Sequence, residues 1–201
     1  MPLDLLLALI GFAFVTSITP GPNNMMLLTS GVNFGFRRTV PHMLGIGIGF
    51  TLMVALIGLG LGQIFERYPL LYSILKYVGA VYMLWLAWGI ANSGPVDEGE
   101  VRGKPMSFLQ AAAFQWVNPK AWVMGVGAIA TYTRPENYVA TVLFVALVFG
   151  VVNIPCVGSW AAFGSAMRHL LRDPRIVRWF NITMAVLLVA SLWPVLAEFI
   201  R

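Results

Sequence analysis

Long apolar stretches separated by short polar ones dominate the chain. Six such stretches can be drawn, over residues 3–30, 40–61, 70–91, 107–130, 138–163 and 176–199. Each is close to the roughly 20 residues that a helix needs to cross a bilayer. They are too long and too uniformly apolar for the ~10-residue alternating strands of an outer-membrane barrel. The pattern therefore predicts an all-α integral membrane protein with about six transmembrane helices, since a helix satisfies its own backbone polar groups in lipid.

Composition supports this prediction. The chain has 201 residues, of which 59% are hydrophobic and 10% are charged, whereas soluble domains average roughly 45–50% and 25%. The chain has too few charged residues to cover a water-soluble globular fold, so we expect most of its surface to face lipid. We expect the first stretch to be a retained span rather than a signal peptide. No Lys or Arg precedes it, and no small-x-small cleavage site follows before Pro20.

The first apolar stretch is interrupted by consecutive helix-breaking and polar residues, namely Pro20, Gly21, Pro22, Asn23 and Asn24. Two prolines remove two backbone donors and block the preceding helical turn. Irregular backbone at membrane depth is tolerated only against protein or a water-filled cavity. Two interpretations remain open. The helix is discontinuous and its second half presents its N-terminus and the two asparagines to a polar substrate, or it is merely kinked inside a packed bundle.

A similar interruption, Asn118-Pro119-Lys120, lies in the fourth stretch, with Pro119 99 positions after Pro20. Lys120 is about half-way along an apolar run, where a lysine costs roughly 2.5–3.5 kcal/mol on insertion scales. Its side chain should therefore face a cavity, pair with another group, or extend its long stem to the membrane interface.

The matched interruptions suggest an internal repeat. Residues 1–92 form the first three-helix repeat, 93–106 a polar cytoplasmic linker, and 107–201 the second three-helix repeat. An odd number of spans in each half makes the two halves enter the membrane from opposite sides. Inverted repeats with paired broken helices are typical of secondary transporters, whose substrate sites lie between the breaks. Direct similarity between the halves is slight, so this prediction depends on position and hydropathy.

Basic residues between the apolar stretches predict the orientation. One side would carry eight of them: Arg37, Arg38, Arg102, Lys104, Arg168, Arg172, Arg175 and Arg178. The other side would carry three: Arg67, Arg134 and Arg201. By the positive-inside rule the first side is cytoplasmic, and six spans then place both termini outside. Orientation explains the net charge of +5, so we expect no nucleic-acid partner.

Other features add less. Asn153 and Pro155 could bend the fifth span toward a cavity. His42 could relay protons or simply sit at the interface. No Asp or Glu lies deep in any span, and no phosphate-binding glycine loop or Ser-His-Asp set is present. One Cys and two His form no metal-ligand pattern. We therefore expect no metal, no cofactor and no enzymatic activity.

In three motifs the chain resembles the LysE/RhtB family of amino-acid exporters. They are residues 19–23 (TPGPN), 31–39 (GVNFGFRRT) and 118–122 (NPKAW), and the resemblance covers the whole length. It implies about six helices, a multi-pass location in the bacterial inner membrane, and export of amino acids or related metabolites driven by the proton gradient. The absence of a buried acid argues against a cationic substrate.

We therefore predict a secondary transporter that exports a small neutral amino acid by alternating access. The expected substrate-binding residues are Pro20, Gly21, Pro22, Asn23, Asn24, Asn118, Pro119 and Lys120. Lys120 and the N–H groups after each break would bind the carboxylate, and the asparagines would orient the amino group. The alternatives are an exporter of metal cations or other ions, which would need acidic or histidine ligands at membrane depth, and a membrane-embedded lipid-modifying enzyme. A homodimer is left open.

Overall fold

The computed structural model describes residues 1–95, 101–168, 171 and 173–193, and confirms the all-α class. The long helices are α1 (Leu3–Ile18), α2 (Pro22–Phe34), α3 (Phe36–Leu56), α5 (Pro69–Ala91), α7 (Pro119–Tyr132), α8 (Tyr138–Met167) and α9 (Pro174–Ala190). Shorter helical pieces are η1 (Ile57–Leu61), α4 (Gly62–Arg67), α6 (Phe108–Phe114), η2 (Gln115–Val117) and η3 (Pro135–Asn137). Within the expected linker, β1 (Gly94–Pro95) and β2 (Val101–Arg102) pair antiparallel.

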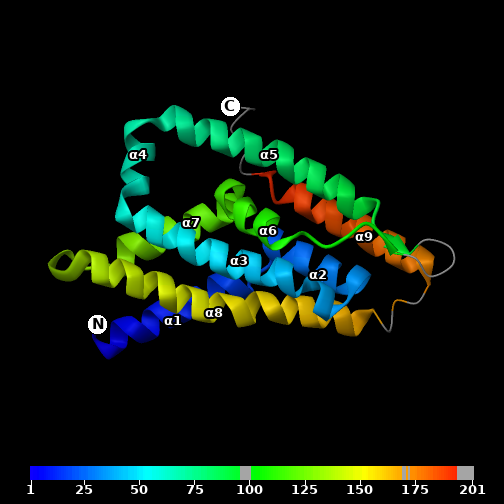
Figure 1. The fold of residues 1–201 in the computed structure, drawn as a ribbon, viewed down its shortest axis with the longest axis horizontal. Helices are drawn as coiled ribbons and strands as arrows, with labels where there is room; N and C mark the ends of the chain where they lie inside the picture. Colours follow the sequence, from blue (N-terminus) through cyan, green and yellow to red (C-terminus); the bar gives the residue numbers. More distant parts are fainter. Residues whose placement is uncertain (96–100, 169–170, 172, 194–201) are drawn as a thin grey trace.

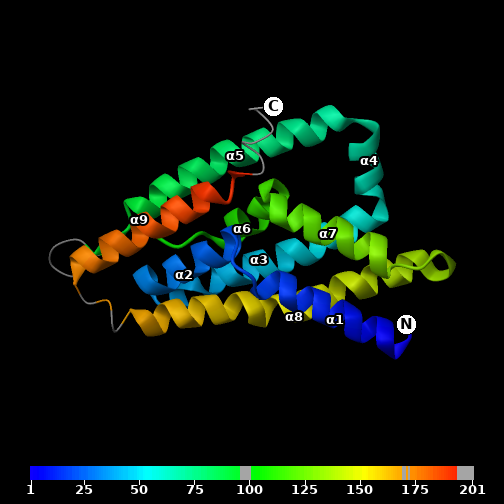
Figure 2. The same cartoon turned by 180° about the vertical axis from the view of Figure 1, so that it is seen from behind.

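The long helices run lengthwise between two ends of the molecule (Figures 1 and 2). Helix α8 packs most extensively on α2, α3 and α1, and α5 packs on α9. These contacts join helices of the two expected repeats, so the halves share their packing. The β-hairpin, the end of α8 and the start of α9 gather at one end, and α4, η3 and the N-terminus lie at the other.

Three described helices are long and apolar enough to cross a membrane: Phe36–Ile64, Ser73–Ala91 and Pro135–Met167. The bent pair of α1 and α2 passes the same test as one broken span and makes a fourth. The α6–α7 pair and α9 do not pass, because α6 and α7 are short pieces around a break and α9 has 17 residues. The predicted sixth stretch also ends at residues 194–199, outside the described residues. Six crossings thus stay a prediction.

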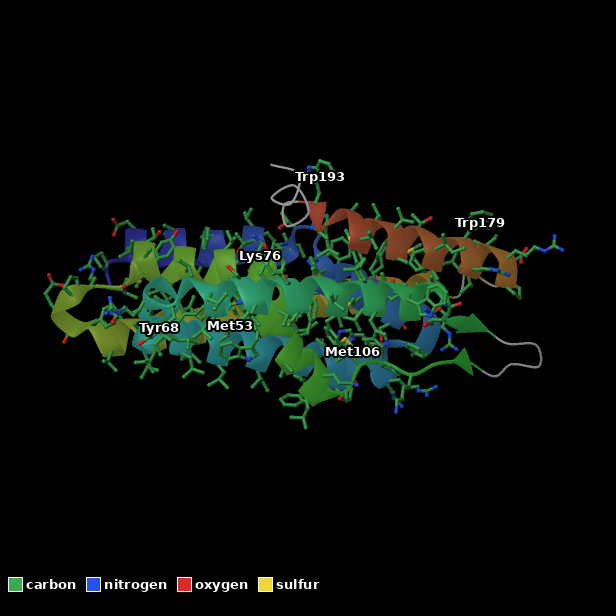
Figure 3. All side chains as sticks on the ribbon, turned by 90° about the horizontal axis from the view of Figure 1, so that it is seen from above. Met53, Tyr68, Lys76, Met106, Trp179 and Trp193 are labelled. Carbon is green, nitrogen blue, oxygen red and sulfur yellow. The ribbon has the colours of Figure 1, made fainter. Side chains whose placement is uncertain are left out.

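Helix α3 turns sharply into α4 at Gly60, whose φ of 124° lies in the region that favours glycine. The turn carries α5 to the side of the bundle, where only 17% of its membrane-spanning window is buried by other parts of the chain. Trp179 on α9 and Trp193, which follows α9, also point away from the other helices (Figure 3). The outer faces of α5 and α9 are therefore apolar surfaces suited to lipid.

Three apolar clusters hold the described helices together, and the two larger ones include the broken helices. In the first, Phe149 of α8 makes edge-on ring contacts with Phe12 of α1 and Phe50 of α3, at centroid distances of 5.9 and 5.4 Å. In the second, Met26 of α2 and Phe114 of α6 pack with α5 and α9. The clusters involve both helices of each broken pair, so they fix where the breaks lie.

Glycines allow α2 and α8 to approach closely. A Cβ atom on Gly164 would meet the backbone carbonyl of Leu28, and one on Gly31 would meet that of Ala161. Close approach through small residues is typical of helix pairs in membranes, where association depends on packing rather than on the hydrophobic effect. The distance between α2 and α8 is therefore limited by direct contact of their backbone atoms.

We predict that Gly164→Ala destabilises the protein. The added methyl group collides with backbone atoms that cannot rotate away, and overpacking typically costs ~1–3 kcal/mol. At about 2–4 °C per kcal/mol, the apparent melting temperature in detergent should fall by roughly 2–12 °C. Gly11→Ala is the matched control, because a Cβ atom there meets nothing within 4 Å. Equal melting temperatures for the two variants would show that the close approach of α2 and α8 is not needed.

We also predict that the end carrying the basic residues is cytoplasmic. In a Cys156→Ala background, Arg37→Cys should react with a membrane-impermeant maleimide only after the cells are permeabilised. Arg134→Cys, at the opposite end, should react from outside in intact cells. The reverse pattern would contradict the orientation given by the basic residues.

Candidate functional site

The first break separates α1 from α2 by a bend of 55°. Thr19 (ψ 145°) and Gly21 (φ 179°, ψ 178°) are extended, and Pro22 occupies the first turn of α2, where its missing N–H is not needed. Helix α1 ends at Ile18 and a new helix begins at Pro22. The first span is therefore a discontinuous helix rather than a single kinked one.

The carbonyl groups freed at the end of α1 are bonded by side chains from other helices. Asn24 Nδ2 of α2 donates to Ser17 O and Thr19 O, both at 2.8 Å. Trp160 Nε1 of α8 donates to Ile18 O at 3.0 Å. The last carbonyls of any helix lack partners within it, and in a membrane protein water cannot always replace them. These donors stabilise the broken end.

Lys120, in the first turn of α7, also donates to the broken end of α1. Its Nζ donates to Thr19 O at 2.8 Å, to Thr19 Oγ1 at 3.0 Å and to Pro20 O at 3.3 Å. An ammonium group has three donors, and a cation is favoured at a helix C-terminus. Lys120 therefore pairs with the first break instead of extending to the interface. The two interruptions face each other, as the matched prolines predict.

The second break begins α7 in a similar way. Asn118 has extended backbone, and its side-chain oxygen caps the new helix by accepting a hydrogen bond from Lys120 N at 3.1 Å. Pro119 follows at the first helical position. A second bond spans the break, because Trp122 Nε1 of α7 donates to Trp116 O of η2 at 2.8 Å. The Asn118 cap thus places Lys120 on the first turn of α7, opposite Thr19.

A pair of amides joins the two breaks a second time. Asn23 Nδ2 donates to Gln115 Oε1 at 2.8 Å, and Gln115 Nε2 donates back to Asn23 Oδ1 at 3.3 Å. Gln115 is fully buried and also donates to Ala111 O. The start of α2 is therefore tied to η2, independently of Lys120.

A small cavity lies between the breaks. Its volume is about 20 Å³, enough for roughly one water molecule. It is lined by Thr16, Ser17, Gly21, Asn23, Asn24, Phe50, Asn118, Lys120, Ala121, Met124, Asn153 and Val157. The nearby α8 residue Asn153 donates through Nδ2 to Ser17 Oγ at 3.0 Å. Four helices thus contribute polar groups to one enclosed space.

Two acceptors at this cavity are buried and have no partner, Asn24 Oδ1 and Asn153 Oδ1. The orientation of the Asn24 amide is well defined, because both of its Nδ2 partners are carbonyl oxygens that can only accept. Leaving a buried acceptor unpaired costs ~1–3 kcal/mol. Among the described residues neither oxygen has a donor, so the central cavity keeps two hydrogen-bond acceptors available for a donor that is not part of the chain.

The structure brings together most of the residues that the sequence singled out. Asn23, Asn24, Asn118 and Lys120 line the cavity, as do Gly21 and Asn153. The three prolines shape the breaks without lining the cavity, and Pro155 is exposed on α8. Sequence reasoning missed Thr16, Ser17, Thr19 and Gln115. Their signal was proximity to the breaks, since each lies within four residues before a predicted interruption.

Broken helices that face each other around a polar cavity are typical of secondary transporters. The chain matches the LysE type translocator family over residues 14–191. It belongs to that family.

Named relatives agree with this assignment. Proteins called cysteine/O-acetylserine efflux protein, from Salmonella typhi and from Escherichia coli strain K12, are each 35% identical to this chain over 183 residues. The aligned part covers 89% of this chain and 90% of each relative. No solved structure matches the chain significantly. The chain is therefore similar to efflux proteins over nearly its whole length.

Proposed function

We propose that the protein exports a small neutral amino acid, with the central cavity as its substrate site. The observation that carries this proposal is that one cavity contains both a positive charge and hydrogen-bond acceptors without partners. Lys120 supplies a positive charge, and Asn24 Oδ1 and Asn153 Oδ1 are acceptors without partners. A zwitterion offers the complements of both, a carboxylate and an ammonium group.

The lining suggests how each end of the substrate would be bound. The carboxylate would accept hydrogen bonds from Lys120 Nζ, supported by the positive ends of α2 and α7. The ammonium group would donate to Asn24 Oδ1 and Asn153 Oδ1. Asn23 and Asn118 are already engaged, with Gln115 and with the α7 backbone, so we now assign them to holding the site open rather than to binding the amino group.

Lys120 also provides a route to conformational coupling. In the closed cavity all three of its donors bond Thr19 and Pro20. A substrate carboxylate would compete for the same ammonium group and release the end of α1. A ligand shifts a conformational equilibrium only through differential affinity for the two states. Exchange of Lys120 between α1 and the substrate supplies that difference, and alternating access would follow.

The names of the relatives narrow the substrate class. Cysteine and O-acetylserine are small amino acids without net charge at neutral pH, and no Asp or Glu is among the residues lining the central cavity. We extend to this chain the remaining expectations: a bacterial inner-membrane location, six spans in two inverted repeats, and export coupled to the proton gradient. Positively charged α2 and α7 ends that meet between two breaks support the inverted-repeat arrangement.

We predict that Lys120→Met abolishes export while the protein stays folded and inserted. Methionine keeps most of the stem and removes the charge. A hydrogen bond to a charged group contributes ~1.5–3 kcal/mol, so substrate binding should weaken by roughly 10- to 100-fold. Lys120→Arg should lose part of the affinity, because the planar guanidinium cannot place its donors on the same three oxygens. The assay is amino-acid release from cells loaded with O-acetylserine or cysteine-containing dipeptides.

The matched control is Lys76→Met, which removes another lysine from an apolar helix, on α5, one that does not line the central cavity. It should export like the wild type. Binding to purified protein without a gradient then separates substrate recognition from energy coupling. Wild-type affinity in Lys120→Met would refute the carboxylate role.

A further inference from the structure

A second, larger cavity lies nearer the basic end of the molecule. Its volume is about 240 Å³, against about 20 Å³ for the central one. It is lined by α2, the start of α3, the end of α5, and residues 103–106 that lead into α6. A water needs about 10–15 Å³ of such space, so the larger cavity can hold a molecule of amino-acid size, whereas the central cavity cannot in this conformation.

His42 is the distinctive group of this cavity. Its side chain is 2% exposed, lines the cavity, and has no hydrogen-bond partner at either Nδ1 or Nε2. The side chain is therefore buried inside the protein. An imidazole offers a donor and an acceptor when neutral, and buried polar groups are nearly always satisfied. The pair of unsatisfied nitrogens points to a polar ligand at this position.

The chemistry of the other lining side chains indicates which ligand would fit this cavity. Thr29, Ser30 and Asn33 line the cavity from one face of α2, where they already bond Met25 O, Thr39 and Asn181. Lys104 carries a positive charge on the segment before α6. Tyr82 and Trp85 stack at a centroid distance of 5.5 Å and form an aromatic wall. No described lining residue is an Asp or Glu. The lining thus suits a carboxylate near Lys104, an ammonium group against an aromatic face, and a short polar side chain near His42.

We infer that this cavity is a loading site, where the exported amino acid binds from the cytoplasm before it reaches the central cavity. The inference rests on the proposed function and on the orientation given by the basic residues. Helix α2 connects the two sites, because Asn23 lines the central cavity and Met26, Ser30 and Asn33 line the larger one. From Asn23 to Ser30 is about two helical turns, roughly 10 Å. Met26, which is buried and lines the larger cavity, follows Asn23 by about one helical turn.

Protection of a thiol in the cavity tests this inference without requiring transport. Gly89 lines the cavity, and a Cβ atom there meets nothing within 4 Å, so Gly89→Cys in a Cys156→Ala background should fold. The purified protein is labelled with N-ethylmaleimide in increasing O-acetyl-L-serine, which has no thiol of its own. At about ten times the dissociation constant, labelling should slow about tenfold, because only unoccupied protein reacts. Gly11→Cys, equally open but on α1 outside the cavity, is the matched control and should label at a constant rate.

Substitutions of His42 and of Lys120 test which cavity the ligand occupies. His42→Leu should remove the protection, and His42→Gln, which keeps a donor and an acceptor, should restore part of it. Lys120→Met should leave the protection in place, because it alters the central cavity only. Protection that survives His42→Leu, or that disappears in Lys120→Met, would overturn the assignment of a separate loading site.

Export by the wild type, measured in parallel, keeps the two proposals distinct. Export of O-acetylserine without protection of the thiol in the Gly89→Cys variant would leave the proposed function standing and overturn the loading site. Protection without export would retain the cavity as an amino-acid site and overturn the proposed function. Equal slowing of labelling in the Gly89→Cys and Gly11→Cys variants would mean a nonspecific effect of the probe, and would also overturn the loading site.

Discussion

The carbonyl groups at the end of α1 are the constraint on which the rest of the site depends. A helix that stops inside a membrane bundle leaves its last carbonyls without partners, and lipid offers no replacement. Each of four successive carbonyls, from Ser17 to Pro20, accepts a side-chain donor from α2, α7 or α8. These donors draw three other helices to one point. The polar cavity is a consequence of this convergence, because the same asparagines that donate nitrogen leave their oxygens unpaired.

The two cavities differ in size. The central cavity has room for about one water, whereas the larger one, on the side that we assign to the cytoplasm, has room for a substrate. Helix α2 borders both, and its packing on α8 is fixed by backbone contact at Gly31 and Gly164. Helix α1 packs on α8 as well, with Phe12 against Phe149, so α1, α2 and α8 form one packed group beside the central cavity.

Local chemistry made the breaks predictable. The prolines at 20, 22 and 119 disfavour a continuous helix, and both interruptions lie within a residue or two of where the sequence places them. Proline alone does not decide this, because Pro41 and Pro155 lie inside the continuous helices α3 and α8. The partners across space could not be predicted in the same way. That Trp160 bonds the Ile18 carbonyl, or that Gln115 pairs with Asn23, depends on helix rotation and on distances of 92 or more positions along the chain. The unpartnered nitrogens of His42 could not be predicted for the same reason, because they depend on which helices pack around its side chain.

The central claim is that Lys120 exchanges its α1 oxygens for the substrate carboxylate. An experimental structure with O-acetyl-L-serine bound at the breaks measures this directly. The account predicts that Lys120 Nζ lies within hydrogen-bond distance of the carboxylate and has left Thr19 O or Pro20 O, with the ligand's amino group on Asn24 Oδ1 or Asn153 Oδ1. A ligand bound at the breaks while Nζ still bonds Thr19 O, Thr19 Oγ1 and Pro20 O would contradict it.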